Sequence, residues 1–360
     1  MIVKSLELSH FRNYEALKID LESGTNILYG NNAQGKTNIL EAIYLGATTK
    51  SHKGSKDKDI IQFGHQESHI RIFVEKKEKQ FQIDMHLKKS RAKGIAINKI
   101  PIKKASELFG ILNIVFFSPE DLNIIKNGPS ERRRFMDLEL CQIDKIYLDD
   151  LSKYSKILNQ RNKLLKDIYF KPHLEDTLPV WDMQLAEFGR RIIKRRREFV
   201  SQLNEIVTKI HYNISGGKEE MVLAYEPNVE EDFFEREIKR LHDKDLKQGQ
   251  TNAGPHRDDM SFSIRGTDIR KFGSQGQQRT SALSLKLSEI ELVSQVMRDM
   301  PVLLLDDVLS ELDSQRQNYL LNNICGTQTI ITCTGLDEFI RNRFHINRVF
   351  EVIEGKVFRE

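Results

Sequence analysis

The chain has 360 residues, of which 39% are hydrophobic and 30% are charged, and this balance excludes disordered and fibrous proteins. Its 56 lysines and arginines stand against 52 aspartates and glutamates, so a net charge of +4 identifies no acidic partner by itself. No apolar run approaches the roughly 18 residues that cross a bilayer. The cysteines Cys141, Cys325 and Cys333 are odd in number and lack paired metal-ligand spacing, which indicates reduced thiols in the cytoplasm.

The first part of the chain, 1–118, is predicted to be β-rich around one nucleotide-binding helix. Its run 30–37 fits the phosphate-loop pattern G-x-x-x-x-G-K-[ST] at every defined position. A β-prone run, 25–29, precedes the loop, and 38–45 follows with apolar residues at helical spacing. Strand, loop and helix therefore come in the order that the motif needs, and a nucleoside triphosphate is the predicted ligand.

Each residue type in this loop suits phosphate binding. Gly30 and Gly35 let backbone N–H groups turn inward around an anion, and the start of the helix adds the positive end of its dipole. Lys36 is expected to reach the outer phosphates, and the Thr37 hydroxyl is expected to ligate Mg²⁺.

A hairpin is predicted further along this part. Residues 81–87 alternate between apolar and polar, and the alternation resumes at 95–97 after a basic turn. The pattern predicts an antiparallel sheet beside the nucleotide core. We expect three lysines of the turn to be exposed and to have no structural role: Lys88, Lys89 and Lys93.

From 119 to 250 the apolar residues recur at helical spacing. One stripe lies within 151–168 and another within 181–210, which predicts two long helices packed as an arm. Stripes of this length are more typical of a helical core than of an extended coiled coil. The predicted domains are the N-terminal part of a head at 1–118, the arm at 119–250, and the C-terminal part of the head at 251–360.

A Ser/Gly/Gln-rich turn at 272–279 opens a run of helical period, 280–287. Alone, such a turn is most often an ordinary helix cap, but it can also act as a second anion cradle. Because one subunit needs only one cradle per triphosphate, the second one suggests closure over the nucleotide of a partner molecule.

The run 301–307 is predicted to be a buried parallel strand that ends in two carboxylates, and such strand ends form ligand sites in open α/β sheets. Asp306 is expected on the metal side. Asp307, one residue closer to the γ-phosphate, is the candidate general base for the attacking water. The run 310–313 follows shortly after, and the last strands are expected around 329–332 and 349–352.

These elements, in this order, resemble the ABC-type ATPase heads of DNA-repair and chromosome-maintenance proteins, and within that group the RecF family of bacterial recombination mediators. The resemblance covers nearly the whole chain. It implies an α/β fold: an ABC-type P-loop ATPase head, made of a mixed sheet and an antiparallel β subdomain, with an inserted α-helical arm. The runs that carry it are 10–14, 30–38, 117–122, 129–137, 254–259 and 272–279.

The resemblance implies a subunit that dimerises head to tail around two ATP molecules, binds DNA in that state, and releases the DNA when it slowly hydrolyses ATP. This weak, DNA-stimulated ATPase would work with RecR and RecO in loading RecA at single-strand gaps. Two departures from the general ABC pattern are Gln275, where transporters usually have glycine, and Asp307, where they usually have glutamate. The shorter Asp307 predicts slow turnover. For the loop between the two lobes, Glu120 or Asp121 is the candidate.

The resemblance also assigns residues to the site. Lys36 and Asp307 would act in catalysis, and Thr37 and Asp306 would hold Mg²⁺. The contacts to ATP would be made by Arg12 and Asn13 near the base and ribose, by Gly30, Asn31, Asn32, Ala33, Gln34, Gly35, Lys36, Thr37 and Asn38 in and after the loop, by Asp306, and by Ser274, Gly276, Gln277 and Asp313 at the γ-phosphate and seam of the other subunit.

Three clusters of basic residues could hold DNA. Phosphate contacts need only lysines and arginines on one exposed face, and no base-reading pattern is evident, so double-stranded DNA and single/double-strand junctions would be bound without sequence specificity. Each cluster alone is more often a solvated face, and Arg133 and Arg134 could instead make internal contacts. The candidates are Lys88, Lys89, Lys93, Arg132, Arg133, Arg134, Arg195 and Arg196.

Two other functions fit a phosphate loop. The nucleotide-binding subunit of a membrane transporter would have glycine at position 275, glutamate at position 307 and a shorter helical insertion. A DNA-binding module that uses ATP only as a structural cofactor would release no phosphate.

Overall fold

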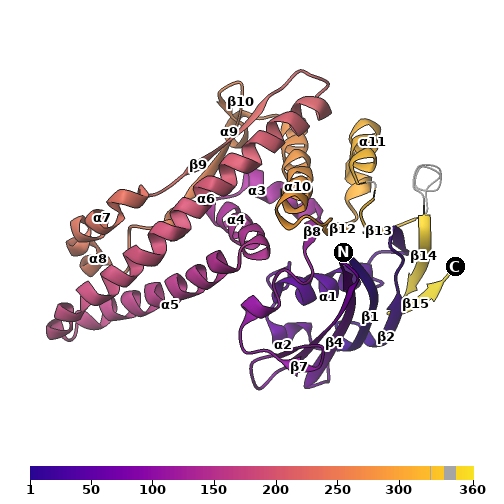
Figure 1. The fold of residues 1–360 in the computed structure, drawn as a ribbon, viewed down its shortest axis with the longest axis horizontal. Coiled ribbons are helices and arrows are strands. Elements are labelled where there is room, and N and C mark those ends of the chain that lie inside the picture. The colour runs from indigo at the N-terminus through magenta and orange to yellow at the C-terminus, as the bar shows by residue number, and fades with distance from the viewer. Residues whose placement is uncertain (325, 336–345) are drawn as a thin grey trace. The chain divides into compact units, whose positions relative to one another are not determined.

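The structure is a computed structural model that describes residues 1–324, 326–335 and 346–360 (Figure 1). These residues form two compact units, each considered on its own: residues 1–121 with 285–360, and residues 122–284. The predicted segment 251–360 is thus shared between the units. Of the described helices, none is both long and apolar enough to cross a membrane. Cys141 and Cys333 are buried thiols, whereas Cys325 lies outside the described residues.

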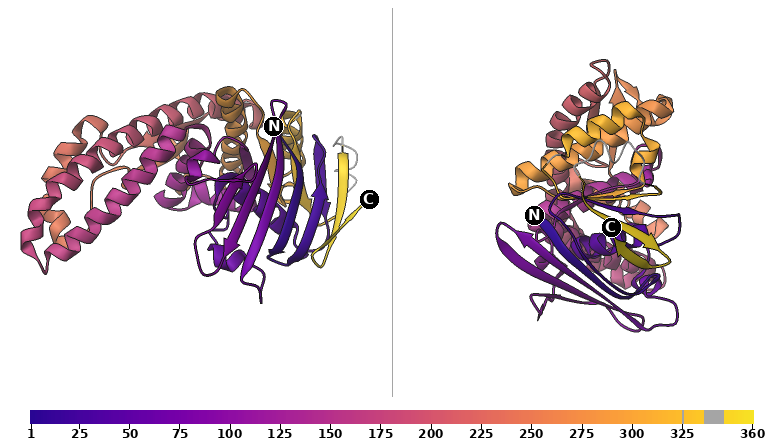
Figure 2. Two further views of the ribbon diagram at one scale, coloured as in Figure 1. Left: turned by 60° about the horizontal axis from the view of Figure 1, so that its bottom comes forward. Right: turned by 90° about the vertical axis from the view of Figure 1, so that its right-hand side faces the viewer.

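The first unit contains an antiparallel sheet, whose strands (indigo to purple) lie side by side in Figure 2. Inward-facing residues alternate along the strands, as Ile70, Ile72 and Val74 show. The predicted hairpin is confirmed, because Met85 pairs with Ile95 across two antiparallel strands. The strand order is β2 (Tyr14–Asp20), β1 (Ile2–Phe11), β4 (Glu67–Lys76), β5 (Lys79–Lys88), β6 (Gly94–Ile97) and β7 (Ile100–Pro101), and the short helix α2 (Asp57–Ile60) lies beside β5.

The second sheet of this unit is mixed. Five of its strands run parallel, and the sixth, at the C-terminal end of the chain, is antiparallel to its neighbour. The order is β15 (Lys356–Arg359), β14 (Ile346–Ile353), β3 (Thr25–Tyr29), β13 (Thr329–Cys333), β12 (Val302–Asp306) and β8 (Ile114–Phe117). The predicted acid-bearing strand is therefore confirmed as β12, which is buried along its whole length.

The helix after the phosphate loop, α1 (Lys36–Thr48), lies between the two sheets. It packs against β4 and β5 on one side and against β8, β12 and β13 on the other. Gly46 permits this close approach, because a Cβ there would lie 2.2 Å from Cδ1 of Ile72 on β4. Helix α11 (Ser314–Asn323) also belongs to this unit. Together, these layers confirm the predicted α/β class.

The second unit is built on two long helices, α5 (Lys145–Ile168) and α6 (Leu178–Ile214), which lie side by side in Figure 1. Their buried stripes include Tyr154 and Leu165 on α5 and Leu185 and Phe199 on α6. The two predicted long helices are therefore confirmed. The other helices are α3 (Leu122–Lys126), α4 (Pro129–Ile143), α7 (Phe234–Arg240), α8 (His242–Gln248), α9 (Ile269–Phe272) and the start of α10 (Gln275–Met297), which continues into the first unit.

The second unit also contains a small antiparallel sheet that was not predicted: one of its strands lies within the predicted helical segment 119–250, and the other two follow that segment. Its order is β11 (Thr267–Asp268), β10 (Asp259–Ile264) and β9 (Met221–Glu226). Along β10, Met260, Phe262 and Ile264 are buried while the residues between them are half-buried. This period of two is the strand signal that the prediction missed.

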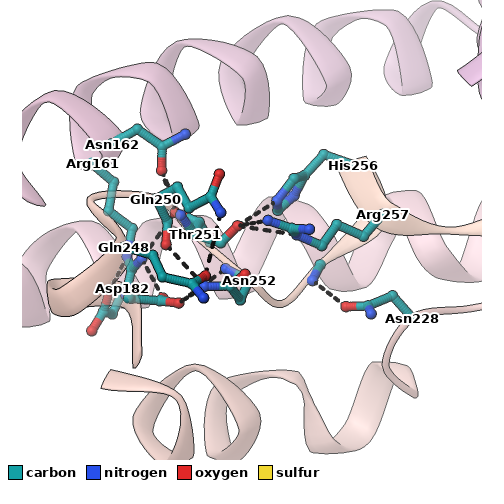
Figure 3. Close-up of polar contacts among 12 residues, drawn as sticks. Arg161, Asn162, Asp182, Asn228, Gln248, Gln250, Thr251, Asn252, His256 and Arg257 are labelled. Atoms are coloured by element: carbon teal, nitrogen blue, oxygen red, sulfur yellow. Dashed lines mark hydrogen bonds and ion pairs between the residues drawn. The ribbon is translucent and has the colours of Figure 1, made fainter. Parts of the chain in front are cut away.

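A polar cluster fastens the two long helices to the segment that follows α8 (Figure 3). The buried Arg161 of α5 donates to Asp182 of α6 at 2.6 Å and to Asp245 of α8 at 2.7 Å. The carbonyl of Thr251 can only accept, so Nε2 of His256, 3.1 Å away, donates to it, and Nδ1 accepts from the Tyr154 hydroxyl at 2.7 Å. Burial lowers the pKa of His256 to about 4, which agrees with this neutral ring.

Candidate nucleotide-binding site

The phosphate loop has the shape that its glycines allow. Strand β3 ends at Tyr29, and α1 begins at Lys36. Gly30 and Gly35 have φ values of +149° and +115°, which disfavour any side chain. A Cβ would also lie 2.3 Å from the Val352 carbonyl oxygen at Gly30, and 2.5 Å from Nδ2 of Asn13 at Gly35. The motif therefore folds as its sequence predicts.

Lys36 is buried, and its ammonium group lies over the loop. Its Nζ donates to the carbonyls of Gly30 at 2.6 Å and Asn31 at 2.9 Å. The positive charge is thus held beside the loop amides and the start of α1, which together favour the binding of an anion.

Three oxygen-bearing side chains from distant parts of the sequence meet beside the loop. The Thr37 hydroxyl donates to Oδ1 of Asp306 at 2.8 Å, and the Thr332 hydroxyl donates to the same oxygen at 2.7 Å. Hydroxyl and carboxylate oxygens suit Mg²⁺, which typically takes one or two protein carboxylates with substrate phosphates and water. In the described ranges, no group of three or more His, Cys, Asp or Glu residues could hold a metal ion.

Asp307 directly follows β12 and has a left-handed backbone, with φ of +52°. Its N–H donates to the Thr332 hydroxyl at 3.0 Å, so the turn is fixed. Partial burial raises the pKa of the half-buried Asp307 carboxyl; the Lys36 charge opposes this, and the Asp306 charge adds to it. A raised pKa makes the carboxylate a better proton acceptor.

The rim of the loop is cross-linked by amide side chains. Nδ2 of Asn13 donates to the Gln34 carbonyl at 2.9 Å, and Nδ2 of Asn38 donates to Oδ1 of Asn13 at 2.8 Å. Arg12 donates to both oxygens of the buried Glu41, at 2.8 and 2.7 Å. Burial raises the pKa of Glu41, but hydrogen bonds from Arg12 and Ser51 outweigh it and hold that pKa below its usual range. Sequence reasoning missed Glu41, which fixes Arg12 in place.

The turn between the last two strands also holds the loop. The N–H of Gly355 donates to the Gln34 carbonyl at 3.1 Å, and the N–H of Glu354 donates to Oε1 of Gln34 at 2.5 Å. Gly355, at φ +73°, is in contact with Asn13, whose carbonyl oxygen a Cβ would approach to 2.7 Å. The Glu354-Gly355 pair is a turn signal in the sequence, but nothing there shows which loop the turn touches.

The Ser/Gly/Gln-rich turn lies in the second unit, at the start of α10. The Ser274 N–H donates to Oε1 of Gln277 at 2.9 Å, and the Gln277 N–H donates to Oγ of Ser274 at 3.2 Å. This reciprocal pair is a capping box. Ser274 and Gly276 are exposed. In the first unit, Asp313 caps α11 in a similar way, accepting from the Arg316 N–H at 3.0 Å.

Two predicted DNA contacts are wrong. Arg132 is buried and donates to both oxygens of Asp259 at 2.6 and 3.0 Å. Arg196 is also buried and pairs with Asp258 at 3.0 Å and Asp137 at 2.7 Å. Neither side chain can leave its carboxylates for solvent without leaving a buried charge unpaired, so neither is available to DNA.

The other candidates differ in how tightly they are held. Lys93 bonds Asp57 at 2.9 Å and the Thr49 carbonyl, and Lys88 pairs with Glu67 at 2.7 Å, so the expectation of no structural role fails for both. Arg133 donates to the Asp258 carbonyl at 2.7 Å, and Arg195 pairs with Asp144 and Glu198. Lys89 and Arg134 are exposed. Asp121 accepts from the Ser118 N–H at 2.7 Å, and its inter-lobe role remains a prediction.

Comparison with known proteins bears out the resemblance. Residues 2–355 match the family model of the RecF/RecN/SMC N-terminal domain. The chain is 69% identical over 357 residues to the DNA replication and repair protein RecF of Agathobacter rectalis, covering 99% of each chain. It is 61% identical over 362 residues to the protein so described in Lachnospira eligens, covering 100% of each chain.

Solved structures agree. One of them is the structure of the recombination mediator protein RecF-ATP in the RecFOR pathway. Its sequence is 36% identical to this chain, and the two structures match with a TM-score of 0.91 over 99% of this chain and 97% of that one. The Smc head domain of Pyrococcus furiosus, at 16% identity, has a TM-score of 0.58 over 99% of this chain and 96% of that chain, which is a likeness of fold alone. The chain belongs to the RecF family of DNA replication and repair proteins.

Proposed function

We propose that this protein is an ATP-switched DNA-binding protein. ATP and Mg²⁺ bind at the phosphate loop, two subunits then close head to tail, and the dimer holds double-stranded DNA or single/double-strand junctions. Weak, DNA-stimulated hydrolysis releases it. In the cytoplasm it works with RecR and RecO to load RecA at gaps. The observation that carries the proposal is the 2.8 Å contact between Thr37 and Asp306, which joins the two halves of a nucleotide site.

The chemistry is assigned to residues as follows. Lys36 and the loop amides hold the outer phosphates, and Thr37 and Asp306 hold Mg²⁺, which offsets phosphate charge when bound. Asp307 orients the attacking water and accepts its proton. Its side chain is one methylene shorter than glutamate, which places the carboxylate farther from that water and supports slow turnover.

Dimerisation is assigned to the exposed start of α10. Ser274, Gly276 and Gln277 present a helix N-terminus that can receive the γ-phosphate held by the other subunit, and Asp313 is assigned to the seam. The exposure of Ser274 and Gly276 supports this role. The γ-phosphate then bridges the two subunits, so ATP and ADP should give different oligomeric states.

The paired acids provide the test. Asp306→Ala is expected to lose magnesium-dependent nucleotide binding, because it removes the carboxylate that Thr37 and Thr332 orient. Asp307→Asn is expected to keep binding but to stop hydrolysis, and so to trap the dimer on DNA. Light scattering with ATP, ADP or neither, each with and without duplex DNA, reads out the dimer, and phosphate release reads out hydrolysis.

The outcomes separate the alternatives. Normal turnover by Asp307→Asn would show that another group is the base. If the unaltered protein releases no more phosphate than the Lys36→Arg variant does, ATP serves only as a structural cofactor. The membership of the RecF family, together with Gln275 and Asp307 in place of glycine and glutamate, argues against a transporter subunit.

A further inference from the structure

The Ser/Gly/Gln-rich turn is tied to a carboxylate that lies outside the turn. Nε2 of Gln277 donates to Oε1 of Glu219 at 2.8 Å, across 58 residues of sequence. Oε1 of the same Gln277 side chain accepts from the Ser274 N–H at 2.9 Å. Two hydrogen bonds in series therefore connect the Glu219 carboxylate to the exposed start of α10.

Glu219 fixes which way round the Gln277 amide lies. A carboxylate can only accept hydrogen bonds, so the NH2 group of the amide has to face it. Turning the amide over would place its oxygen against the carboxylate and its NH2 group against the Ser274 N–H, and both contacts are repulsive. The amide oxygen is thus held on the Ser274 N–H, where it completes the capping box.

The backbone that carries this carboxylate is held as well. Glu219 lies in the short segment between α6 and β9. Its N–H donates to Oγ of Ser215, just after α6 ends, at 3.1 Å. The Thr208 hydroxyl of α6 donates to the carbonyl of Met221, the first residue of β9, at 2.8 Å. The segment is therefore fixed at both ends to a helix of 37 residues.

A buried histidine contacts the other oxygen of the carboxylate. His211 is fully buried, and its Nε2 lies 3.6 Å from Oε2 of Glu219. The Ser284 hydroxyl of α10 donates to the Thr280 carbonyl at 2.8 Å, so its oxygen accepts from Nδ1 of His211 at 3.0 Å. The histidine ring is thereby anchored on α10. Both oxygens of Glu219 thus have a fixed neighbour, which opposes rotation of the side chain.

We propose that Glu219 is a positioning residue for the ATP-dependent dimer. By holding Gln277, it keeps the Ser/Gly/Gln-rich turn in the geometry that receives the γ-phosphate bound by the other subunit. Glu219 acts through Gln277 and not on the nucleotide directly. The inference rests on the proposed function and deepens it, because it names the group that prepares the turn before the subunits meet.

The size of the effect follows from this preparation. A long side chain that is immobilised only when two proteins associate weakens the association roughly two- to twelvefold. The proposed dimer contains two such turns, so loss of both hydrogen bonds from Gln277 to Glu219 should raise the dimer dissociation constant about five- to 150-fold. The negative charge of Glu219 acts in the opposite direction, because it repels the γ-phosphate.

Two substitutions separate the hydrogen bond from the charge. Glu219→Ala and Glu219→Gln both remove the charge, but glutamine keeps an oxygen that can accept from Gln277. Light scattering over a series of protein concentrations at saturating ATP gives the dimer dissociation constant. The constant should be about five- to 150-fold higher for Glu219→Ala than for Glu219→Gln. Glu219→Gln should dimerise at least as tightly as the unaltered protein.

The neighbouring Glu220 provides a matched control. It is exposed and makes no hydrogen bond or ion pair in the part of the chain that the structure describes, so Glu220→Ala should dimerise as the unaltered protein does. The affinity of the Glu219 variants for ATP, measured on dilute monomer, should stay within about twofold of normal, because the phosphate loop belongs to the first unit.

A Gln277→Ala background shows whether Glu219 acts through Gln277. Without the amide, the oxygen kept by Glu219→Gln has nothing to hold. Glu219→Ala and Glu219→Gln should then dimerise equally, within about twofold. A purely structural role of Glu219 would preserve the difference between them. If Glu219→Ala lowers the Tm, Glu219→Met takes its place, since methionine fills similar space without a strong acceptor.

Two outcomes overturn the inference. One is an equal dimer dissociation constant for Glu219→Ala, or its methionine replacement, and Glu219→Gln while Gln277 is intact. The other is a difference between these variants that persists in the Gln277→Ala background. If the unaltered protein forms no dimer with ATP, the proposed function itself fails and the inference falls with it, a result distinct from the other two.

Discussion

Arg196 offers a sharp test of the reassignment of the basic residues. The side chain is buried in the second unit and donates to the Pro255 carbonyl at 2.6 Å, to Asp137 at 2.7 Å, to Asp258 at 3.0 Å and to the Tyr147 hydroxyl at 3.0 Å. Arg196→Ala removes every one of these donors and leaves two carboxylates without their cation.

The loss should be large. Removing one partner of a buried ion pair costs about 3–5 kcal/mol, and a unit of this size loses roughly 2–4 °C of Tm per kcal/mol, so we expect a drop of about 6–20 °C. Arg197→Ala is the matched control, because Arg197 is exposed, where it pairs with Glu230 and lies over the Tyr225 ring at 5.8 Å. Its cost should be about 0–1 kcal/mol.

Calorimetry of both variants without nucleotide or DNA provides the measurement. Adding Asp258→Asn to Arg196→Ala should recover part of the lost Tm, because it removes one of the two carboxylates left without a cation. Equal Tm values for the Arg196 and Arg197 variants would refute the buried network. They would also reopen Arg196 as a DNA contact.

The other predictions concern the switch and its base. Ser274→Arg should leave ATP binding to the monomer largely intact and abolish dimerisation, since the added side chain blocks the exposed start of α10. An unchanged dimer fraction by light scattering would exclude contact between Ser274 and the nucleotide of the other subunit. Burial raises the folded-state pKa of Asp307, so its ionisation destabilises the fold as pH rises through that pKa. Asp307→Asn should therefore raise the Tm at pH 7 without nucleotide, by an amount that shrinks as the pH falls toward 4. If the Tm of Asp307→Asn at neutral pH were lower than that of the unaltered protein, the result would contradict the raised pKa of Asp307.

The predictable parts of the site are those in which local pattern and chemistry agree. The phosphate loop needs its glycines for backbone reasons that the sequence shows, and β12 is an unbroken apolar run before two acids. Position along a helix also explains the mistaken assignment of Arg196. Arg196 lies four residues after Ile192 and three before Phe199, and so on the buried stripe of α6. A run of basic residues does not show which of them face the core unless each is placed by its position around the helix.

Other features depend on contacts that no local pattern specifies. The closure of Gln34 by the turn at Glu354 and Gly355 joins segments 320 residues apart. The turn at 62–65, which exposes Phe63, is held by the carbonyl and the ring of His10 in β1. Hydropathy alone would have assigned an exposed phenylalanine to a core.

The order in which the site is assembled limits when the protein can act during its own synthesis. Strand β3 lies between β13 and β14, and Gln34 takes its last partners from residues 354 and 355. At roughly 5–20 residues per second, a ribosome makes the phosphate loop about 16–64 s before the turn that closes it. Through that interval Ile27 and Leu28, fully buried in the finished fold, lack their neighbouring strands and need protection from aggregation. An interrupted translation product that ends before β12 lacks Asp306, so it cannot complete a nucleotide site of its own.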